Sequence, residues 1–403
     1  MRILIASSTY APAMNGQAVF TTNLAEGLVK LGHQVMVVLD SNHAQAASNS
    51  INGVLVKELS SINIDFLHKG VYFSPFPGRE IQRHFNEFQP EIVHIQDHYP
   101  SCQMVVKAAR KRGIKIVGSN HFIPENLTPY IPGSMMLKPV INWVLWQWML
   151  SVYRHADVIT AQSKAAAEII GQQKLKAPII PISCGIDLDT YFPDPNIDRT
   201  SYRQRYGIDP QKKVFLFFGR IDRDKRIDLL LHAMQKLTRN DVQLVIAGRG
   251  HEDEALKRLA KKLDLKQRVR FTGFIPAADV PGLMNSVDIF VMPSEAELLS
   301  ISTLEAMACG KPVVLVNALA LPELVRGGEN GYLFKPGDAG DLARLMNHLA
   351  DHPELWPEMG VVSREITMVH SLDLTIQKYQ SIYMKLTGVV SVPDITQQIN
   401  EPV

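Results

Sequence analysis

The stretch SEAELLSISTLEAMACGKPVV (residues 294–314) has the pattern of a buried strand-and-helix unit, yet it carries glutamates that such a unit does not need. Glu297 and Glu305 have seven residues between them, and Glu305 stands among the apolar residues with which the helix begins. A carboxylate in apolar surroundings is costly unless hydrogen-bond donors satisfy it. The rest of the chain must therefore supply donors for Glu305.

Apolar strands alternate with helices on the N-terminal side of this stretch and around it. The first half begins with the strand RILIAS (2–7) and a helix whose apolar residues recur at helical spacing from Phe20 to Leu31. The alternation restarts with the strand KVFLFFGR (213–220). Strands that are apolar throughout and joined by helices predict parallel, doubly wound sheets. We therefore expect an α/β fold of two Rossmann-like domains that face an interdomain cleft, a usual place for a ligand.

Changes in composition predict the domain boundaries. Residues 188–212 are polar and rich in turns, which indicates a linker between an N-terminal domain (1–187) and a C-terminal domain (213–364). An amphipathic helix over 365–388 is expected to pack back on the N-terminal domain, and residues 389–403 are expected to fray.

Charge and cysteine content exclude several classes of protein. The formal net charge of the 403 residues is +2, which argues against nucleic acid as a partner. The three cysteines are far apart, so we expect neither a disulfide scaffold nor a zinc site. No histidine pattern has metal-ligand spacing, and no metal is predicted. The start, MRILIAS, is typical of a first strand and not of a signal peptide, which favours a cytoplasmic protein.

A pair of cations follows the strand 213–220. The strand ends at Gly219, and Arg220 and Lys225 come just before the next helix. A guanidinium, an ammonium and the amides of a helix N-terminus together suit a diphosphate. The alternative is a solvated charged loop, because acidic and basic residues surround these two cations.

The glutamates of the opening stretch fit the same ligand. A ribose offers two adjacent hydroxyl donors, and one carboxylate can accept from both. Glu305 is thus predicted to hold a ribose, and Glu297 the sugar beyond the diphosphate. The alternative for Glu305 is a helix-start glutamate that caps its own amides. Gly248 ends the next strand, where Gly-x-Gly alone is more typical of a plain turn. The strand after it leaves through Gly273, and its backbone can meet a base edge.

Together these motifs resemble the retaining nucleotide-sugar glycosyltransferases of family 4, which have the GT-B fold. The most specific part is a proline-serine, then a glutamate, seven residues, and Glu-Ala-Met-Ala-Cys-Gly-x-Pro-Val-Val. The resemblance covers nearly the whole chain. The further matching residues are Gly219, Arg220, Lys225, Gly248, the GID of 185–187 and the NGYLF of 330–334.

The resemblance implies roles for the matching residues. Arg220 and Lys225 would bind the diphosphate and stabilise the leaving nucleotide, and Glu297 would contact the hydroxyls of the donor sugar. His121, after the strand KIVGSNH, matches the family's histidine near the reacting sugar; a lone strand-end histidine is otherwise a structural residue. The donor-binding candidates beyond these are Gly16, Gly219, Gly248, Phe274, Ile275, Leu299, Ser300, Ile301 and Glu305. No cofactor or metal is implied, because the nucleotide-sugar is a substrate and the two cations replace a metal.

The sequence departs from the family at three places that bear on the donor. Arg226 follows Lys225 where the family usually has glycine, which adds charge near the phosphates. Asn15 stands where the family often has glycine, and asparagine tolerates unusual backbone angles. Leu298 and Leu299 follow Glu297 where the family often has Gly-Phe, which affects the geometry around the donor sugar.

Three segments favour a membrane lipid as the acceptor. Residues 139–153 hold three of the four tryptophans and no charge, residues 105–115 form a basic helix, and 120–133 is an apolar loop loosely similar to that of bacterial diacylglycerol glucosyltransferases. Tryptophan favours a lipid interface, and basic residues favour anionic lipid. The alternatives are a helix packed within the domain for 139–153 and a solvated face for 105–115.

The sequence thus predicts a hexosyltransferase that acts with retention on a donor of the UDP-glucose type. Its acceptor would be a hydroxyl of a membrane lipid such as diacylglycerol, at the inner face of the membrane. The alternatives are a soluble sugar or glycan acceptor, a nucleotide-sugar epimerase on the same fold, and a non-catalytic nucleotide-sugar-binding subunit. An epimerase would need further acid and base groups, which the sequence does not identify.

Overall fold

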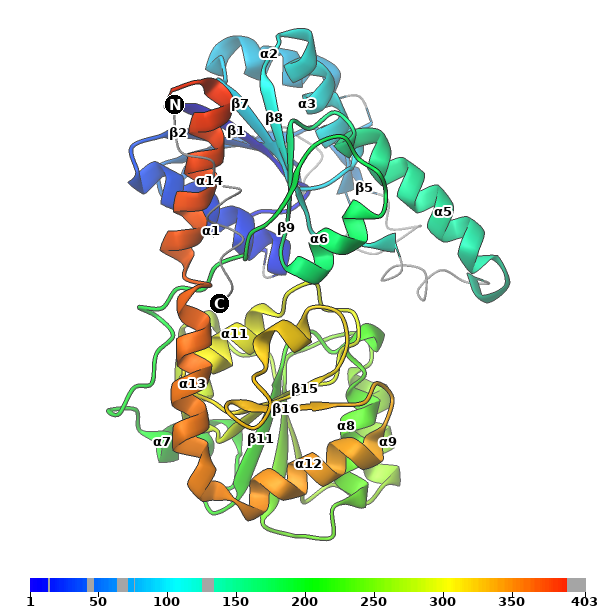
Figure 1. Ribbon diagram of the computed structural model, residues 1–403, viewed down its shortest axis with the longest axis vertical. Helices are drawn as coiled ribbons and strands as arrows, with labels where there is room; N and C mark the ends of the chain where they lie inside the picture. Colours follow the sequence, from blue (N-terminus) through cyan, green and yellow to red (C-terminus); the bar gives the residue numbers. More distant parts are fainter. Residues whose placement is uncertain (14, 42–46, 64–71, 76, 125–133, 390–403) are drawn as a thin grey trace. The chain divides into compact units, whose positions relative to one another are not determined.

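The computed structural model in Figure 1 describes residues 1–13, 15–41, 47–63, 72–75, 77–124 and 134–389. The chain divides into two compact units. Unit 1 comprises Met1–Ser183 and the stretch that begins at Asp373, and unit 2 comprises Cys184–Leu372. Each unit is built around one largely parallel sheet, and the predicted α/β class with two doubly wound domains is confirmed.

In the described part of unit 1, eight strands form a sheet in the order β10-β9-β8-β7-β1-β2-β4-β3. All neighbouring strands are parallel except β3 and β4. The strands are β1 (Arg2–Ala6), β2 (Gln34–Asp40), β3 (Ala47–Ile51), β4 (Val54–Leu59), β7 (Ile92–Ile95), β8 (Lys115–Asn120), β9 (Val158–Ala161) and β10 (Ile179–Pro181), with a separate ribbon of β5 (Ile62–Asn63) and β6 (Tyr72–Phe73).

Helices cover both faces of this sheet. On one face α1 (Gly16–Lys30) and α14 (Leu372–Thr387) lie side by side (Figure 1), so closely that a Cβ on Gly27 would stand 2.1 Å from Ile376 Cδ1. The side chain of Asn15 accepts from Ala18 N and so caps α1; its φ of −94° is ordinary, so unusual backbone angles are not the reason for asparagine here. The remaining helices are α2 (Gly78–Phe88), α3 (Pro100–Lys111), α5 (Ser134–Tyr153) and α6 (Lys164–Gly171).

Unit 2 has six described strands in the order β13-β12-β11-β14-β15-β16, all parallel. They are β11 (Lys213–Phe218), β12 (Val242–Ala247), β13 (Val269–Gly273), β14 (Ile289–Met292), β15 (Val313–Val316) and β16 (Gly331–Phe334). One helical layer contains α8 (Ile227–Lys236), α9 (Asp253–Lys262) and α12 (Ala339–Asp351). The other contains α7 (Arg199–Tyr206), α10 (Val280–Ser286), α11 (Ile301–Ala308) and α13 (Trp356–Met368).

Each sheet has a point where the chain reverses its direction of strand addition. In unit 2 the chain goes from β11 to β12 and β13 on one side and then returns to β14 on the other side of β11. In unit 1 the corresponding neighbours are β1 and β7. Loops diverge at such a switch point and leave a crevice at the carboxyl ends of the strands, where ligands of α/β sheets bind.

Two boundaries differ from the sequence-based expectation. The single helix expected over 365–388 is wrong: α13 ends at Met368 in unit 2, and α14 begins at Leu372 and packs in unit 1. Between the two helices, the backbone of Ile186 bonds to the connecting segment: its N–H donates to His370 O over 2.8 Å, and its carbonyl accepts from Leu372 N over 2.8 Å. These two bonds replace helical ones, so the helix cannot continue. Residues 188–212, expected to form a linker, contain α7 with a buried Arg203. The tail beyond residue 389 lies outside the described residues.

Candidate functional site

The switch point of unit 2 brings together the loops that follow β11 and β14. Lys225 Nζ donates to Glu297 Oε1 over 2.6 Å and lies 3.4 Å from Asp224 Oδ2. Only 16% of the Lys225 side chain is exposed. Burial by itself lowers the pKa of Lys225, but attraction by Glu297 and Asp224 raises it above its ordinary value. The ammonium is thus charged and held at the crevice.

Arg220 stands beside this pair with most of its guanidinium open to solvent. Its side chain is 58% exposed, donates to Asp222 and lies 3.6 Å from Asp224 Oδ2. Asp222 is buried and also accepts from His251 N over 3.0 Å, which ties this loop to the loop after β12. Both predicted diphosphate cations are therefore paired with carboxylates, and they share Asp224. Such a cluster is ready to exchange its carboxylate partners for a stronger anion.

The ends of three strands meet as bare backbone next to these cations. Gly219 N donates to Ala247 O over 3.0 Å, and Gly248 N donates to Gly273 O over 2.9 Å. A Cβ on Gly248, whose φ is +138°, would stand 1.8 Å from the carbonyl oxygen of Gly219. Only glycine fits there. Gly219 and Gly248 are thus needed to bring the ends of β11, β12 and β13 together.

Glu305 lies in the middle of α11, the helix after β14, and its hydrogen-bond donor is Tyr191. The Tyr191 hydroxyl donates to the carboxylate. Burial raises the pKa of Glu305 to about 7, and the bond from Tyr191 partly opposes this increase. The cap of α11 is Ser300, whose Oγ accepts from Thr303 N over 3.3 Å, so Glu305 does not cap the helix. The hydrogen-bond donor that a buried Glu305 requires is thus supplied by Tyr191.

The other predicted donor-binding residues of unit 2 flank this crevice. Phe274 follows β13 with its side chain exposed, whereas Ile275 is buried. The side chain of Leu299 is buried beneath the loop, and Ile301 is the first residue of α11. Leu298 is buried as well, so both leucines that depart from the family pattern pack inward.

In unit 1, His121 lies just beyond β8 with both ring nitrogens occupied. Nε2 is 2.7 Å from Gln96 Oε1, and Nδ1 accepts from Gln162 Nε2. Burial lowers the pKa of His121 to about 4, although Asp97 attracts the charged form. The imidazole is therefore neutral near pH 7, and proton transfer by its ring would require one glutamine to move. The predicted catalytic role of His121 stays a prediction.

At the switch point of unit 1, Asp97, which follows β7, binds the loop that follows β1 and the first turn of α1. Its Oδ2 accepts from Ser8 N over 2.6 Å and from Gln17 Nε2 over 3.1 Å, next to Gly16 at the exposed start of α1. Sequence reasoning missed Asp97, Gln96 and Gln162. One signal could have found them: each is a polar residue at the carboxyl end of an apolar strand. Tyr191 carried no such signal, because it lies in a turn-rich segment.

The tryptophan-rich segment of unit 1, which is predicted to meet a membrane, is partly buried and partly exposed. Trp143 is 62% exposed, whereas Trp146 is buried and Trp148 packs 4.6 Å from the His98 ring. Helix α5, which extends from unit 1 in Figure 1, thus packs along one side and exposes an apolar stripe on another. The stripe consists of Leu137, Val140, Trp143 and Val144.

The basic segment 105–115 is not one helix face. Lys107, Arg110 and Lys111 lie exposed on α3, but Lys115 belongs to β8 and pairs with Asp157 over 2.8 Å. Arg112 binds Gln82 and Asn86 of α2 and is therefore not free to meet a lipid. The apolar loop predicted over 120–133 lies largely outside the described residues.

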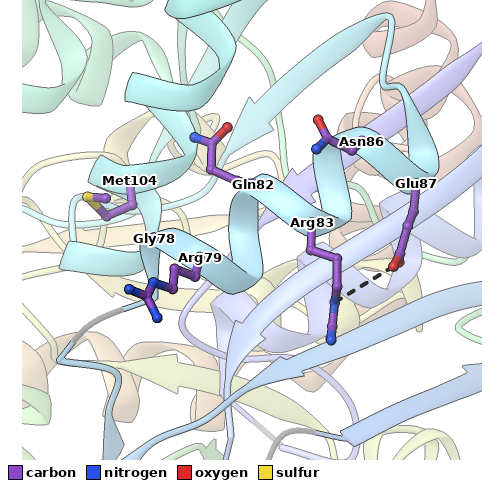
Figure 2. Close-up of a pocket in the computed structure, with 7 residues that line it drawn as sticks. All are labelled: Gly78, Arg79, Gln82, Arg83, Asn86, Glu87 and Met104. Atoms are coloured by element: carbon purple, nitrogen blue, oxygen red, sulfur yellow. Dashed lines mark ion pairs between the residues drawn. The ribbon is translucent and has the colours of Figure 1, made fainter.

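Residues of α2 and Met104 of α3 line an open hollow of about 740 Å³. Figure 2 shows these residues, and none of them is a predicted site residue. Arg83, which lines the hollow, faces Glu87 across 3.7 Å. None of the helices in the described residues has both the length and the hydropathy needed to cross a bilayer. The described residues also contain no group of three His, Cys, Asp or Glu side chains placed to hold a metal ion.

Two family models match the chain. The model described as Glycosyltransferase Family 4 matches residues 14–190, and the one described as Glycosyl transferases group 1 matches residues 198–361. The first match covers most of unit 1, and the second covers most of unit 2.

Individual relatives differ in donor and acceptor. The GDP-mannose-dependent alpha-(1-6)-phosphatidylinositol monomannoside mannosyltransferase of Mycolicibacterium smegmatis is 34% identical over 303 residues, which are 72% of this chain and 75% of the relative. The N-acetyl-alpha-D-glucosaminyl L-malate synthase of Bacillus anthracis is 25% identical over 390 residues, 95% and 97% of the two chains. The solved structure of Anabaena Alr3699/HepE in complex with UDP-glucose has a TM-score of 0.77 at 20% identity, covering 96% of this chain and 100% of that one.

Proposed function

Because this chain belongs to the group 1 glycosyl transferases of glycosyltransferase family 4 and has their GT-B fold, we propose that it moves a hexose from a nucleotide-sugar of the UDP-glucose type to a hydroxyl acceptor. The donor binds unit 2 and the acceptor binds unit 1. The anomeric configuration is retained.

The observation that carries this proposal is the cluster of Lys225, Arg220 and Glu297 at the switch point of unit 2. The two cations bind the donor's diphosphate, and Glu297, released from Lys225, accepts from hydroxyls of the donor sugar. Glu305 accepts from the ribose, whose hydroxyls join or replace that of Tyr191. The backbone around Phe274, whose side chain is exposed, meets the base.

The chemistry follows from where charge develops. The bond between the anomeric carbon and the phosphate oxygen breaks, which leaves positive charge on the sugar and negative charge on the diphosphate. Arg220 and Lys225 stabilise that negative charge more strongly in the transition state than in the bound donor, without a metal or cofactor. The acceptor oxygen attacks from the side that the phosphate leaves, and its proton passes to the departing phosphate oxygen.

For the acceptor we propose a membrane lipid, at a membrane surface that α5 meets. Two observations support it: the exposed apolar stripe of α5, with the exposed Lys138 between its members, and the lipid named for the M. smegmatis relative. Apolar side chains beside a cation suit the interface of an anionic bilayer. The relative from B. anthracis, whose name gives malate, supports a soluble acceptor as the second candidate.

One incubation tests the function and separates the candidates. The protein is mixed with UDP-glucose or GDP-mannose and a total lipid extract, and products are identified by mass, with reactions lacking donor or extract as controls. We expect a lipid heavier by one hexose and nucleotide release that depends on the extract. A hexose on a soluble extract component alone would refute the lipid acceptor. Interconversion of donor sugars without any acceptor would indicate an epimerase, and nucleotide binding without turnover a non-catalytic subunit.

A further inference from the structure

A buried polar network connects His121 to the C-terminal helix α14. Tyr383 OH lies 2.6 Å from His94 Nδ1, and His94 Nε2 lies 2.8 Å from Ser119 Oγ. Tyr379 OH lies 2.9 Å from the same Ser119 Oγ. These side chains are fully or almost fully buried, and they come from α14 and the adjacent strands β7 and β8.

Gln96 joins this network to His121. Its Nε2 lies 3.3 and 3.4 Å from the two ring nitrogens of His94, while its Oε1 lies 2.7 Å from His121 Nε2. Because the amide N–H group of Gln96 stands over the face of the His94 ring, the amide oxygen faces His121 and accepts from it. His121 therefore carries its proton on Nε2, and Nδ1 accepts from Gln162. The network selects one neutral tautomer of His121.

The plane of the His121 ring is fixed by an aromatic contact with Phe20, which also contacts the network. The Phe20 ring of α1 stands between two members of the network, 5.0 Å from the His121 ring and 5.7 Å from the Tyr379 ring, measured between centroids. Tyr379 thus contacts both Phe20 and Ser119. Helix α14, from the far end of the chain, therefore contacts Phe20 through Tyr379 and His94 through Tyr383.

We propose that Tyr379 and Tyr383 are positioning residues, which set the tautomer and orientation of His121 through His94, Gln96 and Phe20. The inference rests on the proposed function, in which His121 lies beside the reacting sugar. According to this inference, α14 contributes to the transfer reaction because two of its tyrosines position a histidine of unit 1. Removal of the two hydroxyls loosens His94 and Phe20, so that Gln96 can turn and His121 is no longer held in one orientation and one tautomer.

The test compares the variants Tyr383→Phe and Tyr379→Phe/Tyr383→Phe with Tyr332→Phe. The control removes a hydroxyl of the same kind from β16, an edge strand of the sheet in unit 2, where it lies 3.0 Å from His348 Nε2. Nitrogen NMR of histidine-labelled protein, with the His121 signal assigned by its loss in His121→Asn, reports the tautomer without any turnover. Kinetics give kcat and KM for the donor, and thermal unfolding shows whether each variant is folded.

In the double variant we expect the nitrogen shifts of His121 to move toward the values of a tautomer mixture. With transfer activity established, kcat should fall about tenfold with little change in donor KM, the order expected when a buried hydrogen bond no longer holds a group in place. Tyr332→Phe should change neither quantity. A folded double variant with unchanged His121 shifts refutes the inference, whatever the activity. Shifts that move while the wild type transfers no sugar would instead refute the proposed function.

Discussion

The two switch points of this molecule are built from different chemistry. That of unit 2 is ionic: Lys225, Arg220 and Glu297 are paired with one another or with aspartates of the same loop. Beside the switch point of unit 1, His121 is held by neutral groups, and both its nitrogens bind glutamine side chains. The ionic cluster can exchange partners when an anion arrives, whereas the neutral network holds one group in one geometry.

Because of this difference, changes in the two units should be detected by different measurements. Disruption of the ionic cluster should appear in the binding and activation of the nucleotide. Disruption of the network in unit 1 should leave nucleotide binding intact and change either the binding of the acceptor or the rate of the transfer step. Each prediction below therefore compares a change at one place with a matched change elsewhere.

The largest effect is expected for Lys225→Ala. Loss of the ammonium removes stabilisation of the charge that develops on the diphosphate, and turnover should fall by about a thousandfold or more. Turnover is measured as acceptor-dependent nucleotide release. Lys236→Ala, at an exposed position in the last turn of α8, serves as the control and should keep full activity and the same melting temperature. A Lys225→Ala protein with near-normal turnover would refute the phosphate role.

Glu305→Gln should weaken nucleotide binding by about ten- to a hundredfold, because hydrogen bonds to a charged acceptor contribute roughly 1.5–3 kcal/mol. The affinity for UDP is measured by calorimetry. Glu329→Gln, at an exposed position in unit 2, should bind like the wild type. Equal loss of affinity for UDP and for uracil alone would argue against a contact with the ribose.

The outer surfaces of the two units can be compared with a pair of valines. Val140 on α5 is 58% exposed, and Val361 on α13 is 60% exposed. Val140→Asp should reduce binding to vesicles of anionic phospholipid by about tenfold, the order expected when one aliphatic side chain no longer enters the lipid interface. Val361→Asp should bind like the wild type in the same sedimentation assay. Equal losses would indicate non-specific charge repulsion and remove the role of α5.

The smallest effect is one of pH, and it should distinguish the two units again. Hydroxyls of a ribose donate to ionised Glu305, so nucleotide affinity should fall as pH drops below the pKa of about 7 in the free protein. Tyr191→Phe removes the donor that opposes this raised pKa, so the midpoint should move to higher pH and the affinity near pH 7 should fall several-fold. Calorimetry across pH 6–8 measures both effects. His121, with a pKa of about 4, should contribute no titration in that range.

A flat profile in the wild type and in Tyr191→Phe would show that Glu305 does not titrate with nucleotide binding. A flat profile in Glu305→Gln alone would assign the titration to this carboxylate.

The sequence by itself determined the fold class, most of the core strands and the family. These depend on local patterns: continuous apolar runs must be buried between helices, Gly219 and Gly248 follow their strands directly, and Lys225 and Glu305 lie in the loop and the helix that come next. Parallel strands place their carboxyl ends at one edge, so the proximity of Lys225 and Glu297 could also be predicted.

The groups that hold these residues come from distant parts of the chain and could be found only from the three-dimensional fold. The partner of Glu305 comes from Tyr191, more than a hundred residues earlier in the chain, and the network around His121 reaches Tyr383 of α14. The break between α13 and α14 likewise depends on Ile186, far away in sequence. Such partners leave no periodic signal, because a hydrogen bond specifies only distance and direction between two groups and not their separation along the chain.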